Sequence, residues 1–186
     1  MTIDYHRELL EQLQWHWTSQ LRPRLDDLTD DEYFWEPVAG CWSIRPRPEG
    51  GFSCDWAPSE PSPPPVTTIA WRLAHVSVLV LGMRTATHFD GVTQQEYGAQ
   101  LQTRDWPGSA ADGLAALDDA YDRWVKGVQS WTAADLEAEC GIAEGPWARH
   151  PRATLVLHIN REVIHHGAEV ATLRDLYRAS GGGRLS

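Results

Sequence analysis

LVLHINREVIHHGAEV, residues 155–170, has the residue spacing of an amphipathic helix. Positions four apart share one face of a helix, so His158, Glu162 and His166 form one stripe across two turns. The stripe is bordered by apolar residues that we expect to be buried, Leu155, Val163 and Val170. Three side chains able to bind a metal, next to a buried face, indicate a polar site inside the protein rather than a solvated surface.

Outward from this stretch, three further segments also have helical periodicity. The predicted long helices span about residues 3–25, 67–89, 110–131 and 152–179. Pro23 is expected to break the first of them, and Gly91 follows the end of the second. Thr29 and Thr132 each precede a short helical pattern and are expected to cap it.

The long connection from Glu36 to Val66 holds most of the prolines. A connection of this length is unusual in a compact domain, and it is either a lid over one end of the protein or a loosely ordered crossover. The sequence contains no strand pattern of any length. We predict an all-α four-helix bundle with a long crossover between helices one and two. It forms one domain over residues 1–180, and residues 181–186, rich in glycine, form a flexible tail.

Composition excludes several classes of function. The 186-residue chain has 26 acidic and 16 basic residues and a net charge of −10, which argues against unspecific nucleic-acid binding. Its three cysteines are widely spaced, which indicates free thiols. The amino-terminal residues do not resemble a signal peptide, and the most apolar run, Val76 to Met83, is too short to span a bilayer. We therefore expect a cytoplasmic protein that does not act on membranes.

His75 lies in the second predicted helix, between apolar residues. A buried imidazole needs a partner, and the stripe on the last helix supplies one if both bind the same metal ion. Imidazole and carboxylate ligands suit zinc, nickel, iron or manganese, and three protein ligands leave positions open, as in catalytic sites. Two simpler readings remain. His75 is a hydrogen-bonded core residue in one, and Glu162 and His166 form a surface ion pair in the other.

Two segments resemble the metal-binding segments of the DinB-like superfamily: TIAWRLAH, residues 68–75, and NREVIHHG, residues 160–167. GCWSIRP, residues 40–46, is similar to the G-W-S-I loop that precedes helix two in that superfamily, with Cys41 inserted. The resemblance covers nearly the whole chain. It implies a four-helix bundle that holds one divalent metal ion through His75, Glu162 and His166. Many members have histidine in place of Glu162, and the glutamate is similar to the mycothiol-dependent maleylpyruvate isomerase branch.

The resemblance also implies a function. Related proteins bind a thiol cofactor at the open metal position, where the cation stabilises the thiolate. We expect a metal-dependent thiol transferase or isomerase that acts on a small electrophile, with zinc as the first choice of metal and mycothiol as the first choice of thiol. The isomerase branch carries a second domain, whereas this chain ends at Ser186, so we expect a single-domain detoxification enzyme rather than a maleylpyruvate isomerase.

The positions of other polar residues near the predicted metal ligands suggest roles for them. His158 and Arg161 are expected to contact the thiol cofactor. Other roles for His158 are contact with the substrate, support of the ligands from behind, and metal binding in place of His166, whereas His165 points elsewhere and packs or caps. Arg45 and Arg72, like Arg161, are candidates to hold an anionic substrate or are structural arginines. The alternative functions are a non-catalytic metal-binding stress-response protein and a bundle with a buried polar network. A homodimer is compatible with the ten tryptophans.

Overall fold

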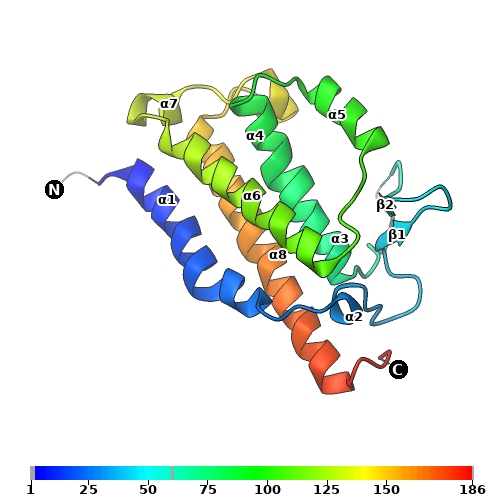
Figure 1. Ribbon diagram of the computed structural model, residues 1–186. Coiled ribbons are helices and arrows are strands. Elements are labelled where there is room, and N and C mark those ends of the chain that lie inside the picture. Colours follow the sequence, from blue (N-terminus) through cyan, green and yellow to red (C-terminus); the bar gives the residue numbers. More distant parts are fainter. Residues whose placement is uncertain (1–2, 60, 186) are drawn as a thin grey trace.

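A computed structural model describes residues 3–59 and 61–185. Within them, four long helical segments pack as a bundle, which confirms the predicted all-α fold (Figure 1). The segments are α1 (Tyr5–His16) continued by η1 (Trp17–Leu21) and η2 (Arg22–Leu25), α3 (Ile69–Ala74) continued by η3 (His75–Gly82) and α4 (Met83–His88), α6 (Ala110–Gln129), and α8 (Arg152–Ser180). The elements η1 and η3 are π-helical, and η2, which contains Pro23, is a 3-10 turn.

Short elements connect the long segments. The short helices are α2 (Asp30–Tyr33), α5 (Gln94–Thr103), α7 (Ala133–Glu137) and the 3-10 segment η4 (Ile142–Trp147). The caps predicted at Thr29 and Thr132 are confirmed, because each hydroxyl accepts a hydrogen bond from the backbone N–H three residues later. Helix α5, which begins with a capping box between Thr93 and Glu96, was not predicted from the sequence. Most of its residues are exposed, so it has no apolar stripe.

In Figure 1 the segments α3–α4 and α6 run in the same direction, so the chain returns along the bundle through α5 and residues 104–109. The α3–η3 segment contacts both α6 and α8, and α1 packs against α8. Side chains that are almost fully buried fill the space between the segments, among them Leu13, Leu73, Leu81, Leu117, Trp124, Ile159 and Val163. Each such side chain contributes about 1.5–3 kcal/mol through the hydrophobic effect. No helix within residues 3–59 and 61–185 is long and apolar enough to cross a membrane.

The π-helical element η3 begins at His75 and ends at Gly82. A Cβ atom at Gly82 would lie 2.7 Å from the carbonyl oxygen of Ser77 and 2.9 Å from the Tyr97 hydroxyl. Only glycine therefore permits this approach. The Tyr97 hydroxyl donates a hydrogen bond of 2.7 Å to the carbonyl of Val78, which fixes α5 against η3. π-Helical turns often occur at functional sites.

The long connection carries an antiparallel hairpin of β1 (Ile44–Pro46) and β2 (Phe52–Cys54). We did not predict this hairpin, because strands of three residues are too short to show alternation. The connection packs against the start of α3, where the backbone of Trp42 bonds to Val66 and Thr68. The expected flexible tail includes Ser186, which lies outside the described residues. Earlier in the tail, the backbone N–H of Leu185 donates to the carbonyl of Pro37.

Candidate metal centre

Two helical segments bring His75, Glu162 and His166 together. His75 is the first residue of η3, and the other two lie on α8. One donor atom from each side chain lies within 4.8 Å of the other two. The imidazole centroids of His75 and His166 are 4.7 Å apart, and Glu162 Oε2 lies 3.4 Å from His166 Nε2. The nitrogen, oxygen and nitrogen donors of these side chains thus converge between η3 and α8.

The His75 imidazole has the properties that a metal ligand requires. Its buried Nδ1 has no hydrogen-bond partner among the described residues. Burial, together with the neighbouring His166 and Arg72, lowers the pKa of His75 to about 4, so the ring is neutral at pH 7. A neutral imidazole keeps a lone pair for a cation, and an unpaired buried nitrogen costs free energy. Two imidazoles and one carboxylate suit a first-row divalent ion, so these residues fit a metal.

Glu169 orients His166. Oε2 of this carboxylate lies 2.7 Å from His166 Nδ1 and 2.9 Å from Arg72 Nε. Because a carboxylate only accepts, Nδ1 carries the proton, and Nε2, which faces Glu162, keeps the lone pair. A carboxylate behind a metal-binding histidine is a common arrangement that fixes the tautomer and the ring orientation.

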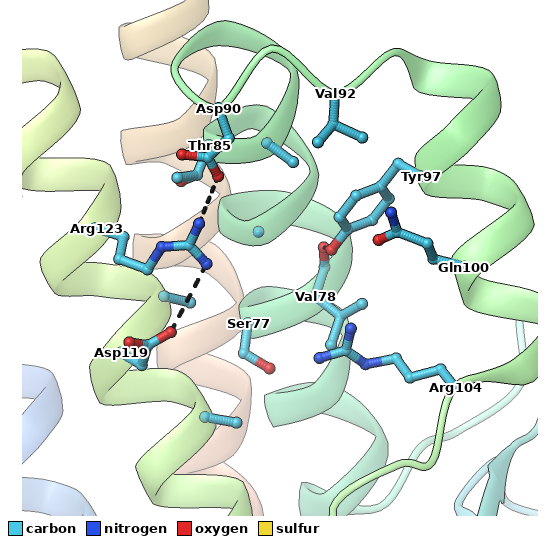
Figure 2. A pocket seen from close by; sticks show the side chains of 14 residues that line it. Ser77, Val78, Thr85, Asp90, Val92, Tyr97, Gln100, Arg104, Asp119 and Arg123 are labelled. Atoms are coloured by element: carbon cyan, nitrogen blue, oxygen red, sulfur yellow. Dashed lines mark hydrogen bonds and ion pairs between the residues drawn. The ribbon is translucent and has the colours of Figure 1, made fainter.

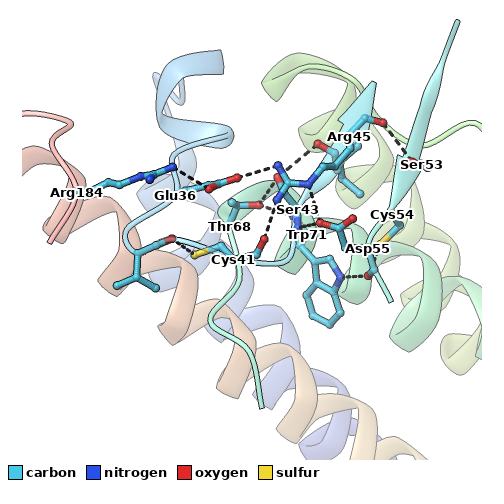
Figure 3. A network of polar contacts seen from close by, with 12 residues as sticks. Glu36, Cys41, Ser43, Arg45, Ser53, Cys54, Asp55, Thr68, Trp71 and Arg184 are labelled. Carbon is cyan, nitrogen blue, oxygen red and sulfur yellow. Dashed lines mark hydrogen bonds and ion pairs between the residues drawn. The ribbon is translucent and has the colours of Figure 1, made fainter. Parts of the chain in front are cut away.

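The crossover orients His75 through Trp71. The Trp71 indole stacks on the His75 ring, with centroids 5.2 Å apart and planes 10° from parallel. Its Nε1 donates a hydrogen bond of 2.7 Å to the carbonyl of Asp55. The side chain of Asp55 is held by Arg45, which also pairs with Glu36, at 2.8 Å in each case (Figure 3). Arg45, in the loop of residues 40–46, therefore holds Asp55, which in turn holds the Trp71 indole against the His75 ring.

A second group of potential ligands shares His166 and consists of His165, His166 and Glu169. His165 has 63% of its side chain exposed, and Glu169 is already paired with Arg72. His158 belongs to neither group of potential ligands that the described residues form. Its Nδ1 lies 2.6 Å from Arg161 and 3.5 Å from the carboxylate of Glu162. Arg161 pairs with Glu162 at 3.4 Å, so both groups contain a carboxylate that already faces an arginine. The group that contains His75 is the more buried of the two.

A cavity of about 390 Å³ adjoins the centre on the side of α8. Its lining includes the two residues assigned from sequence to the cofactor, His158 and Arg161. It also includes Glu144, which has no sequence signal because this residue lies in the irregular segment η4. Its carboxylate pairs with His88 at 3.0 Å and with Arg84 at 3.4 Å. Burial raises the pKa of Glu144, but the hydrogen bond from His88 and the charge of Arg84 outweigh it and hold the pKa below its ordinary value.

The three cysteines are poor nucleophiles. Burial, with the nearby Asp55, raises the pKa of Cys54 to about 12, and burial also raises the pKa of Cys140. Cys41 is buried, and its thiol donates to the carbonyl of Val38. The raised pKa values keep Cys54 and Cys140 protonated at neutral pH, and burial shields Cys41 from reagents.

Comparison with known proteins identifies the family. A sequence model of the DinB superfamily matches residues 12–170, which include all three residues of the candidate centre. The chain therefore belongs to the DinB superfamily. Members of this superfamily typically bind a metal, and the chain has His and Glu side chains grouped as such a site requires. No curated protein and no solved structure gives a significant match.

Proposed function

We propose that this protein holds one divalent cation between His75, Glu162 and His166 and transfers a low-molecular-weight thiol to a small electrophile. The observation that supports this most directly is the convergence of three donor side chains, one of them the neutral imidazole of His75, whose buried Nδ1 has no hydrogen-bond partner among the described residues. A purely structural network would give that nitrogen a hydrogen-bond partner. Zinc is our first choice of metal, because histidine and carboxylate ligands suit it.

The reaction needs a thiolate from outside the chain, because Cys41 is buried and the pKa values of Cys54 and Cys140 are raised. A divalent cation supplies the missing activation, since it lowers the pKa of a thiol that coordinates it. The thiol sulfur forms a bond to the electrophilic carbon, the leaving group departs with its bonding pair, and the thiol proton passes to solvent. Glu169 and Trp71 keep the two imidazoles oriented while this happens.

The cavity beside His158 suits the thiol cofactor. Arg84 and Arg161 line it, each paired with a glutamate, Glu144 and Glu162 respectively, and the Thr154 hydroxyl adds a further polar group. A polar thiol such as mycothiol matches this lining, and Glu162 at the ligand position is similar to the mycothiol-dependent branch. The cavity proposed for the thiol lies beside the proposed centre, because His158 lines the cavity and its Nδ1 lies 3.5 Å from the Glu162 carboxylate.

The test is thiol-dependent consumption of 1-chloro-2,4-dinitrobenzene by tag-free, zinc-loaded protein. We expect turnover with mycothiol, and a loss of about 100-fold in Glu162→Ala, because the cation supplies several kcal/mol of stabilisation. The matched control is Glu137→Ala, which removes an exposed glutamate of α7 and should leave the rate unchanged. His158→Ala should raise KM for the thiol more than it lowers kcat.

Two other results would contradict the proposal. Tight metal binding without thiol-dependent turnover, for mycothiol, bacillithiol and glutathione alike, would favour the non-catalytic metal-binding protein. Absence of metal from protein purified with zinc present would favour the structural polar network. Each result is read from metal analysis and the rate assay on the same sample.

A further inference from the structure

We propose that a second cavity, on the His75 side of the centre, binds a planar aromatic ring that carries a carboxylate. The cavity has a volume of about 300 Å³ and lies between the β1–β2 hairpin, η3 and the end of α5. This proposal names the class of electrophile and in that respect rests on the proposed function. Binding itself is measured without turnover and without metal.

The position of the cavity links it to the centre. Trp71 and Leu79 line it, and they lie four residues before and four residues after His75. Trp71 also stacks on the His75 ring. The cavity that contains His158 adjoins the centre from α8, whereas this one adjoins it from η3. A thiol in one cavity and an electrophile in the other would each lie beside the centre.

The walls of the second cavity favour a flat aromatic group. Three tryptophans line it, Trp56, Trp71 and Trp106, and two leucines, Leu79 and Leu101, add apolar surface. Trp56 is 66% exposed and forms an open edge of the cavity. Indole faces stack on aromatic rings in offset or edge-to-face geometry. The volume is at the lower end of the range of about 300–1,000 Å³ for small-molecule sites.

One lining charge is not neutralised. Arg47 pairs with Asp105 at 3.0 Å, and Asp55 is paired with Arg45. Arg104 forms no ion pair with any described residue, and its Nε is buried without a hydrogen-bond partner. Its guanidinium carbon lies 5.9 Å from the ring centroid of Trp106. An arginine recognises a carboxylate through two parallel hydrogen bonds, so Arg104 selects an anion.

A third cavity, of about 310 Å³ between η3, α5 and α6, supports this reading of Arg104. Figure 2 shows Arg123 in that cavity joined by dashed lines to Asp90 and Asp119, so its charge is already neutralised. The guanidinium of Arg104, which lines both cavities, extends from the end of α5 towards Val78 with no such line (Figure 2). Of the two arginines, Arg104 is therefore the one available to a ligand.

The experiment compares two probes of the same shape, 2-naphthoate and the neutral 2-naphthamide, on metal-free protein. Calorimetry and tryptophan fluorescence report binding. We expect naphthoate to bind about tenfold more tightly, the effect of a charge-assisted hydrogen bond. Arg104→Gln should bring the ratio of the two dissociation constants to about 1, and Trp56→Ala should weaken both probes by a similar factor, since stacking does not depend on charge. Arg178→Gln and Trp15→Ala, which change exposed residues of α8 and α1, are the matched controls.

The proposal is overturned if wild-type protein binds neither probe, binds both equally, or keeps its preference for naphthoate in Arg104→Gln. The ratio of the two dissociation constants in wild-type protein tests the proposal even if a variant fails to fold. Circular dichroism shows whether each variant is folded. Because the protein is free of metal, failure of the thiol-transfer proposal leaves this result intact. Thiol-dependent turnover without naphthoate binding would remove only the aromatic carboxylate as the substrate class.

Discussion

His166 donates a hydrogen bond from Nδ1 to Oε2 of Glu169 over 2.7 Å. The same oxygen lies 2.9 Å from Nε of Arg72, so the carboxylate is itself held in place. Glu169 is thus tied to α3 on one side and to the proposed ligand on the other. The relationship fixes which imidazole nitrogen faces Glu162, and it makes Glu169 a positioning residue for the centre.

The first prediction concerns this carboxylate. Glu169→Gln should weaken zinc binding by about 10–100-fold, the usual cost of removing a partner behind a metal-binding histidine. Competition with a chromophoric chelator measures the affinity. Glu137→Gln, in an exposed position on α7, is the control and should bind zinc like the wild type. Equal affinity in Glu169→Gln and wild type would show that His166 needs no such support.

The second prediction concerns stability. Arg174 and Glu32 form a buried ion pair, with 1% and 4% of their side chains exposed and bonds of 2.6 and 2.9 Å. Arg174 also donates to the backbone carbonyls of Arg24 and Asp26. Arg174→Met should reduce the free energy of unfolding by about 3–5 kcal/mol, because it leaves Glu32 buried without a partner.

Urea denaturation measures that loss, and the double variant Glu32→Leu/Arg174→Met provides the check. It should be more stable than Arg174→Met alone, because both buried charges are then removed. Arg178→Met, at an exposed position of α8, should change stability by less than about 0.5 kcal/mol. A double variant no more stable than the single one would mean that the ion pair is not the source of the effect.

The third prediction concerns the cysteines. The raised pKa of Cys54, about 12, and the burial of Cys41 and Cys140 predict slow reaction of all three thiols with Ellman's reagent in the native protein at pH 8. In denaturant the same three thiols should react quickly. Cys54 lines the second cavity, and Cys54→Ser, which keeps a side chain of similar size there, should keep thiol-dependent turnover of 1-chloro-2,4-dinitrobenzene. Rapid labelling of native Cys54, with loss of turnover in Cys54→Ser, would instead point to a protein thiolate as the nucleophile.

The fourth prediction concerns pH. The pKa of Glu144 is held below its ordinary value of about 4.5 in the folded protein by His88 and Arg84, against the opposing effect of burial. The unfolded state therefore binds a proton first as the pH falls. This carboxylate stabilises the fold above its unfolded pKa, and the contribution is lost as the pH falls through the folded pKa.

The free energy of unfolding, measured from pH 3 to pH 7, should consequently rise less with pH in Glu144→Gln than in the wild type. Glu139→Gln, at an exposed position, should keep the wild-type slope. If Glu144→Gln also has the wild-type slope, the ion pairs with His88 and Arg84 contribute nothing that depends on this carboxylate.

Much of the bundle could be predicted because its information is local. Apolar residues at intervals of three and four, such as Leu73 in α3 and Ile159 in α8, lie on buried faces, and a helix is set by neighbours along the chain. The stripe of Glu162 and His166 was visible for the same reason. His75 was found because an imidazole between apolar residues is rare without a partner.

The missed features depend on contacts between distant residues. The Arg174–Glu32 pair joins residues 142 positions apart, and no local pattern indicates it. At Thr29, the capping-box pattern places Glu32 three residues later, but the fold directs that carboxylate to Arg174 instead. The sequence does not show that Arg104 lacks an ion-pair partner among the described residues, because this depends on the fold, which pairs Arg47 with Asp105 and Asp55 with Arg45.

The central claim is that His75, rather than His165, completes the centre with His166. Zinc content of tag-free protein, measured by mass spectrometry after dialysis, tests it on two single variants. We predict that His75→Ala loses the metal, whereas His165→Ala, which changes an exposed neighbour of His166, keeps one equivalent. Metal retained in His75→Ala and lost in His165→Ala would contradict the account.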